Sequence, residues 1–134
     1  MDLAFRQVDV FASAPFQGNP LGEDVLSVQP DWVLFEGQDI GIVGPGDPAR
    51  HGPDTQFEVR AFADEKQGWE DPVTGSLNAG IAQYLLENNL APAVYVGSQG
   101  MVIGRAGRVF IECVENEIWV GGDVAVRITG AINI

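Results

Sequence analysis

Apolar and polar residues alternate with a period of two along much of this chain, a pattern typical of strands that bury one face. The alternation is most regular over residues 5–11 and 56–62, which therefore predict two strands. Shorter segments of the same character predict strands over residues 40–43, 93–96, 101–103, 108–113, 117–120 and 124–128. We expect a turn between the strands at 93–96 and 101–103, and a hairpin from those at 108–113 and 117–120.

One segment departs from this period. Between residues 77 and 86, apolar and small side chains occupy most of a helix circumference: Leu77, Ala79, Gly80, Ile81, Ala82, Leu85 and Leu86. A helix that is apolar nearly all round is a buried one. One such helix among many strands predicts an α+β fold, with mostly antiparallel sheet wrapped around one central buried helix. Residues 24–36 are compatible with a short helix, whereas residues 44–53 predict a loop.

Composition and charge narrow the class of protein. The chain has 134 residues, which predicts a single domain over residues 1–134. Its 19 acidic residues against 7 basic ones give a net charge of −12. Nucleic acids and anionic membranes bind positive surfaces, so neither is an expected partner. The single Cys113 cannot form an internal disulfide, and neither a signal peptide nor a membrane-spanning apolar run is visible, so we expect a cytoplasmic protein.

The candidate chemistry is concentrated in one motif, Glu70-Asp71-Pro72-Val73-Thr74-Gly75-Ser76, directly before the predicted helix. The first N–H groups of a helix have no intrahelical partner and lie at the positive end of its dipole, so they can bind a substrate carboxylate. The Asp71 carboxylate beside such a site can transfer a proton. The structural alternative is that Thr74 or Ser76 caps the helix and that Asp71 stabilises its dipole by about 0.3–1 kcal/mol.

The remaining reactive side chains predict little chemistry. His51, the only histidine, is expected to be exposed in its loop. Cys113 lies within a predicted strand between alternating apolar residues, which is typical of a small core residue rather than a nucleophile. His, Cys and carboxylate residues show no metal-ligand spacing, so we expect neither a metal nor another cofactor.

Several segments match one known family. The segment Phe57-Glu58-Val59-Arg60-Ala61-Phe62-Ala63 precedes the 70–76 motif, and the chain opens with Gln7-Val8-Asp9-Val10-Phe11 and Pro15-Phe16-Gln17-Gly18-Asn19-Pro20-Leu21. These segments resemble the signatures of the phenazine-biosynthesis isomerase family (PhzF-like proteins), which has the diaminopimelate epimerase-like fold. Residues 104–108 and 120–126 are similar to its closing segment.

This resemblance implies a domain organisation. Family members have two domains, each a sheet wrapped around a central helix, with the active site in the cleft between them. Residues 1–22 would form the N-terminal strand and Gly-Asn-Pro turn, and residues 23–134 a domain of the C-terminal type. The family's principal acid–base glutamate and its Gly-Gly-His segment have no counterpart here, because the chain passes almost directly from the first segment to the second.

The resemblance also implies site residues. Asp71 matches the family's aspartate that faces the cleft and assists proton transfer. Ser76 matches the serine that binds the substrate's carboxylate or hydroxyl, together with the turn at Thr74 and Gly75. Asn19 resembles an asparagine near the cleft in the wider epimerase fold.

Two functions of different class follow. The first is a PhzF-like, cofactor-independent isomerase or epimerase-type protein that transfers a proton on a small carboxylated substrate and that is incomplete or depends on dimerisation. The second is a protein without turnover: a catalytically inactive single-domain fragment, an engineered minimal domain, or a small-ligand-binding or structural protein. Because the family's two domains are similar in fold, two copies of one domain could pair, and we expect a homodimer through the exposed cleft face.

Overall fold

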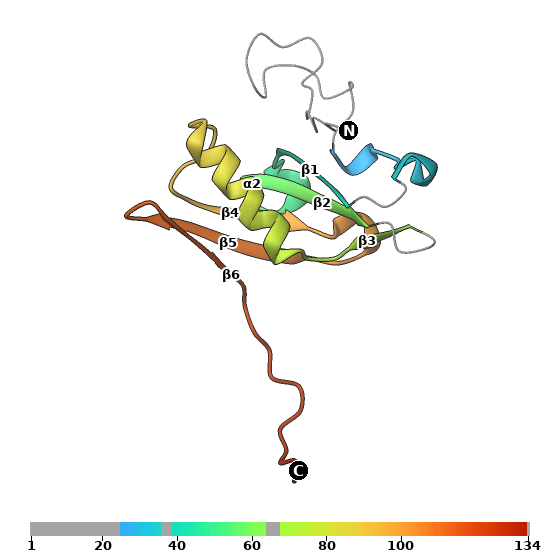
Figure 1. Ribbon diagram of the computed structural model, residues 1–134, viewed down its shortest axis with the longest axis vertical. Helices are drawn as coiled ribbons and strands as arrows, with labels where there is room; N and C mark the ends of the chain where they lie inside the picture. Colours follow the sequence, from blue (N-terminus) through green and yellow to red (C-terminus); the bar gives the residue numbers. More distant parts are fainter. Residues whose placement is uncertain (1–24, 36–38, 64–67, 134) are drawn as a thin grey trace.

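The structure, a computed structural model, describes residues 25–35, 39–63 and 68–133. Its sheet has six strands: β1 (Ile40–Pro45), β2 (Phe57–Ala63), β3 (Trp69–Asp71), β4 (Val94–Gln99), β5 (Gly107–Val114) and β6 (Glu117–Gly121). The strand order is β1-β2-β4-β5-β6, with β3 also paired to β2 (Figure 1). The helical elements are α1 (Pro48–His51), α2 (Gly75–Glu87) and the short 3₁₀ helices η1 (Val25–Ser27), η2 (Trp32–Phe35) and η3 (Met101–Ile103).

The pairing of these strands confirms the predicted fold class. All neighbouring strands of the described sheet are antiparallel except β2 and β4, which are parallel. A mostly antiparallel sheet with few helices is an α+β fold. The predicted strand over residues 5–11 and the candidate Asn19 lie outside the described residues.

The central strand β2 is buried on both of its faces from Phe57 to Phe62. Along one edge it pairs with β1. Along its other edge, Phe57–Val59 pairs with β4 and Ala61–Ala63 pairs with β3. The strands β3 and β4 therefore meet end to end beside Arg60, and the chain leaves β3 for α2 close to this junction.

The helix α2 packs on one face of the sheet (Figure 1). The core between them is apolar and consists of Val43, Phe57, Val59, Ala82, Leu85, Tyr95, Val109 and Ile111. Gly41 in β1 allows a close approach, because a Cβ there would lie 2.4 Å from Cδ1 of Leu77. The outer side of the helix is exposed, with Tyr84 at 52%. A single sheet layer thus buries α2 along one side, whereas its apolar pattern indicates burial nearly all round. No helix in the described part of the chain is long and apolar enough to cross a membrane.

Several local predictions need correction. The strand β4 continues to Gln99, and the strand predicted over residues 101–103 is the 3₁₀ helix η3. Gly100 and Gly104 flank η3 with φ angles of 91° and 72°, which bend the chain there. The loop predicted over 44–53 contains α1, whose N-terminus is capped by the Asp47 side chain. The strands at 40–43 and 56–62 and the hairpin of β5 and β6 are confirmed.

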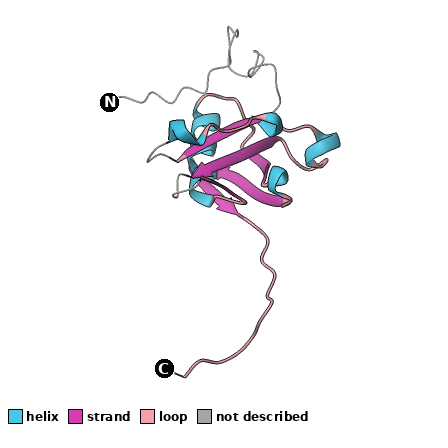
Figure 2. Ribbon diagram, turned by 90° about the vertical axis from the view of Figure 1, so that its right-hand side faces the viewer, coloured by secondary structure: helices cyan, strands magenta, loops and turns pink. Residues whose placement is uncertain are grey.

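The C-terminal segment, residues 122–133, continues from β6 and runs away from the sheet (Figures 1 and 2). All of its residues are exposed. The strand predicted over 124–128 is therefore wrong for the single chain, because no described strand lies beside it to accept its hydrogen bonds.

Candidate functional site

The motif of residues 70–76, called here the signature turn, joins β3 to α2 where β3 and β4 meet. Successive strand residues point to opposite faces of a sheet. Asp71 is paired with Ala61, whose other neighbour Gly41 touches α2, so Asp71 lies on the α2 face. Glu70 therefore lies on the opposite face, and the two adjacent carboxylates do not share a site.

The buried amide of Gln99, at 0% exposure, holds the signature turn together. Its Nε2 donates to the backbone oxygen of Asp71 (2.9 Å) and to Oγ1 of Thr74 (3.1 Å). Its Oε1 accepts from the backbone N–H of Thr74 (3.2 Å) and from Nδ2 of Asn78 (2.8 Å). One side chain from β4 thus fixes the end of β3 and the start of α2 relative to each other.

The Thr74 hydroxyl is directed at the candidate acid–base group. It donates to Oδ2 of Asp71 at 2.5 Å. Thr74 is also the N-cap of α2, but its side chain makes no capping hydrogen bond. The N–H groups of Gly75, Ser76 and Leu77 therefore keep the exposed, positive character of an uncapped helix start. The first turn of α2 contains no acidic residue to neutralise it.

The structure brings four of the five sequence-predicted site residues into this one turn. Asp71 and Thr74 are half-buried and bonded to each other, and Gly75 and Ser76 are exposed in the first turn of α2. A Cβ placed at Gly75 would meet nothing within 4 Å, so the space beside the turn is open. The turn therefore offers a carboxylate, a hydroxyl and free N–H groups to a ligand.

Glu70, the neighbour of Asp71, has a structural role. It forms a buried bidentate ion pair with Arg60, with bonds of 2.9 Å from Nε and 2.7 Å from Nη2. The Nη1 of Arg60 donates to the backbone oxygens of Val25 and Val28, and its guanidinium lies 4.8 Å from the ring centroid of Phe62. This pair secures η1 and β3 to the outer face of the sheet.

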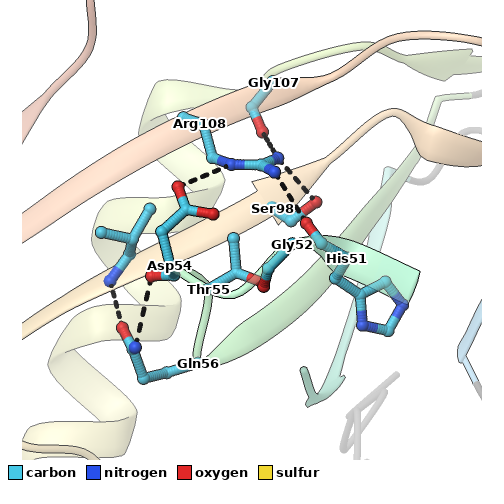
Figure 3. A network of polar contacts seen from close by, with 9 residues as sticks. His51, Gly52, Asp54, Thr55, Gln56, Ser98, Gly107 and Arg108 are labelled. Carbon is cyan, nitrogen blue, oxygen red and sulfur yellow. Dashed lines mark hydrogen bonds and ion pairs between the residues drawn. The ribbon is translucent and has the colours of Figure 1, made fainter. Parts of the chain in front are cut away.

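A second polar cluster lies on that outer face, around Arg108 of β5 (Figure 3). Its Nε donates to Oδ2 of Asp54 (3.1 Å), and its Nη2 donates to the backbone oxygen of His51 (2.7 Å). Its Nη1 donates to Oγ of Ser98 and to the backbone oxygen of Gly107. Arg108 therefore ties the α1 loop to β4 and β5, and the cluster has a structural explanation.

His51 is buried in this loop, so the prediction that it is exposed is wrong. Its Nδ1 accepts from the backbone N–H of Asp47 at 2.6 Å. Burial, with a smaller effect of the neighbouring Arg50, lowers the pKa of His51 and favours the neutral ring. A neutral, internally bonded histidine at the end of α1 belongs to the loop's structure.

Glu58 of β2 is the one fully buried acidic residue of the described chain, at 0% exposure. Burial raises its pKa to about 6, although the nearby Ser98 hydroxyl and Arg108 guanidinium act in the opposite direction. Neither of its carboxyl oxygens makes a hydrogen bond. Glu58 shares the outer face with Arg60, so the sheet separates it from Asp71 and it cannot act with Asp71 on one substrate.

The described residues form no metal site. No group of three His, Cys, Asp or Glu side chains in residues 25–35, 39–63 and 68–133 is close enough to hold a metal ion. Cys113 is a free, partly buried thiol in β5. The signature turn is the candidate site of the described chain, because it places the Asp71 carboxylate beside a helix start without a side-chain cap.

A sheet carrying α2 on one face, with a Glu-Asp-Pro turn leading into that helix, defines a domain of the phenazine biosynthesis-like class. The model of that family, described as phenazine biosynthesis-like protein, matches residues 22–132. The chain therefore belongs to this family. No curated protein and no solved structure gave a significant match.

Two residues of the site, Gln99 and Asn78, are not predicted by the sequence pattern. The pattern predicts that Gln99 lies in a turn after a shorter strand, where a polar side chain is expected to be solvated. The sequence does contain an indication for Asn78, because this polar residue lies on the buried side of a largely apolar helix. A buried amide needs hydrogen-bond partners, so Asn78 indicated a polar neighbour without identifying it.

Proposed function

We propose that this chain is a cofactor-independent isomerase or epimerase-type protein that moves a proton within a small carboxylated substrate bound at the signature turn. Family membership supports the class of reaction. The observation that carries the proposal is the Asp71 carboxylate held by the Thr74 hydroxyl, directly beside the uncapped start of α2. The free thiol of Cys113 is compatible with a reducing compartment, and we propose a cytoplasmic location.

In this mechanism the substrate carboxylate accepts hydrogen bonds from the N–H groups of Gly75 and Ser76 and from the Ser76 hydroxyl. The same donors stabilise the negative charge that develops when a proton leaves the adjacent carbon. Asp71 accepts that proton: the C–H bond breaks, its electron pair enters the substrate's conjugated system, and an O–H bond forms on the carboxylate. Return of the proton to another carbon, or to the other side of the same carbon, completes the isomerisation.

The geometry of Asp71 suits this role. Its Oδ2 is occupied by the Thr74 hydroxyl, and no described residue donates a hydrogen bond to its Oδ1. The second oxygen is therefore available to the substrate. Since Gln99 holds both the Asp71 backbone and Thr74, the carboxylate is held in place before the substrate binds.

A second candidate function is binding of a carboxylated ligand without turnover. The observation that favours it is the position of Glu58, which lies on the other face of the sheet and cannot serve as the second acid–base group. An anion site needs only the helix start and Ser76, whereas proton return by a second group needs a residue that the signature turn does not contain.

Solvent deuterium incorporation separates the two functions. Dihydro-aromatic carboxylic acids would be incubated with the protein in D₂O and followed by NMR and mass spectrometry. The proposal predicts incorporation by the wild type and its loss in Asp71→Asn, with full activity retained in Glu112→Gln, an exposed carboxyl on β5. Ligand binding without incorporation in the wild type would instead support the binding function.

A further inference from the structure

The last strand of the sheet and the segment after it both lack a partner in the described chain. The strand β6 (Glu117–Gly121) pairs with β5 along one edge and ends the strand order, so its other edge has no partner strand among residues 25–35, 39–63 and 68–133. Residues 122–133 continue from it without a break and are exposed throughout. An open edge joined to an unpaired extended segment is a template for adding another strand.

The sequence of the C-terminal segment is that of a half-buried strand. Val124, Val126 and Ile128 alternate with polar or small residues, yet they are 90%, 78% and 90% exposed. In an extended chain they share a face with Ile118 and Val120 of β6. Ile118 already packs against the core beneath α2, so these residues would extend the same apolar face.

We propose that β6 and the following residues pair with the same segment of a second copy, antiparallel, about a two-fold axis at Gly122. Two identical antiparallel strands are related by a two-fold axis, so the β6 edge of each copy pairs with the C-terminal segment of the other. The unpaired backbone groups of both copies then find hydrogen-bond partners at the same time. One sheet then runs through the dimer, and the strand predicted over residues 124–128 forms between copies.

The register follows from the sequence. With Gly122 on the axis, Glu117 lies opposite the partner's Arg127, which gives two ion pairs in the dimer. Ile118 then lies opposite the partner's Val126, and Val120 lies opposite the partner's Val124. A single register therefore pairs the charged residues at the two ends of the contact and the apolar residues between them.

Other registers lose this match. Moving the axis by one residue toward the C-terminus places Asp123 opposite the partner's Asp123, and moving it by one toward the N-terminus removes the pair between Glu117 and Arg127. Centring the axis between two residues places apolar side chains opposite polar ones, because opposed residues point to the same face.

The net charge of −12 on each copy opposes association. At 0.1 M salt, the repulsion between exposed charges that are more than about 10 Å apart is largely screened.

A disulfide across the axis tests the register directly. The variant Gly122→Cys in a Cys113→Ser background places two thiols opposite each other, within the range that a disulfide spans. A Cβ at Gly122 meets only the backbone oxygen of Arg108 at 3.6 Å, an ordinary contact, so the substitution is tolerated. Mild oxidation is expected to give covalent dimer rapidly. The matched control, Gly130→Cys in the same background, has open space but lies far from its counterpart, so it should cross-link slowly.

Charge exchange tests the same contact without a covalent bond. Sedimentation equilibrium at micromolar concentrations is expected to show a dimer for the wild type. Glu117→Arg and Arg127→Glu alone should each weaken association at least tenfold, and the double variant should restore it. Val102→Asp, an exposed valine on η3, is the control for a general loss of association. Circular dichroism confirms that each variant is folded.

A monomeric wild type, equal cross-linking at residues 122 and 130, or a double variant no tighter than the singles would overturn the proposal. The homodimer expected from the sequence uses the cleft face instead, and the experiment separates the two, since neither Glu117 nor Arg127 belongs to the signature turn. The result is also independent of the deuterium experiment, because no residue of the dimer contact takes part in the proposed reaction.

Discussion

The side-chain amides of Gln99 and Asn78 are joined by a buried hydrogen bond of 2.8 Å, which links the last residue of β4 to the first turn of α2. The strands β4 and β3 both pair with β2, so this bond closes a continuous framework around the signature turn. The position of Asp71 beside the helix start is therefore set by a contact between segments 21 residues apart.

Gln99→Leu is expected to destabilise the protein by about 2–4 kcal/mol, because it leaves two backbone groups of the signature turn without partners and removes one of the two hydrogen bonds of the buried Asn78 amide. Urea unfolding measures the change. The control Gln83→Leu, on the exposed side of α2, should stay within about 0.5 kcal/mol of the wild type. Equal effects of the two substitutions would show that the buried amide does not hold the turn.

Thr74→Val is expected to lower the free energy of unfolding by about 1–2 kcal/mol, because the side chain then neither accepts from Gln99 nor donates to Asp71. If the proposed reaction takes place, deuterium incorporation should fall as well. Thr74→Ser keeps the hydroxyl and should recover most of both losses. A valine variant as active and as stable as the serine variant would contradict this role of the hydroxyl.

Removing one partner of the buried pair between Arg60 and Glu70 should cost about 3–5 kcal/mol, because the remaining charge has no counter-ion inside the protein. Glu70→Leu and Arg60→Met test this by urea unfolding. The double variant removes both charges. Its loss of unfolding free energy is expected to be smaller than the sum of the losses in the two single variants. Strict additivity would indicate that the two side chains do not act as a pair.

Glu58 makes stability depend on pH in a defined window. Its pKa of about 6 in the folded protein lies above the ordinary value of 4.5, so the folded state favours the protonated carboxyl. This contribution is fully present below pH 4.5 and is lost as the pH rises through 6. Relative to Glu58→Gln, the wild type should therefore lose about 2 kcal/mol of unfolding free energy between pH 4 and pH 7. Urea unfolding of both proteins at the two pH values measures the difference. An equal change in unfolding free energy for the wild type and the Glu58→Gln variant would contradict a buried Glu58 carboxyl with a raised pKa.

Much of the fold was predictable because each strand shows its alternation of apolar and polar residues within its own segment of sequence. The segment that became β2 alternates regularly, and the hairpin of β5 and β6 has a clear turn at Glu115 and Asn116, both with positive φ. The position of Asp71 and Ser76 at the start of a helix was likewise readable from the order of residues. These features depend on neighbours in the sequence, so local reasoning finds them.

The features that sequence reasoning missed depend on distant contacts. The end of β4 looked like a turn because Ser98 and Gln99 are polar, yet both are buried and satisfied by Arg108 and Asn78. His51 looked like a loop residue, but Arg108 secures its backbone to the sheet. A polar residue predicts exposure unless a partner from another element is known, and the sequence alone does not supply that partner.

The central claim is that the signature turn binds a carboxylate at the start of α2, next to Asp71. Its most direct test is a ¹H–¹⁵N NMR titration of the protein with a dihydro-aromatic carboxylic acid, using the corresponding neutral amide as the control ligand. The claim predicts saturable shifts of the Gly75, Ser76 and Leu77 amides with the acid alone, weakened by Ser76→Ala. Shifts centred on the α1 loop and Arg108, or equal shifts with the neutral amide, would contradict it.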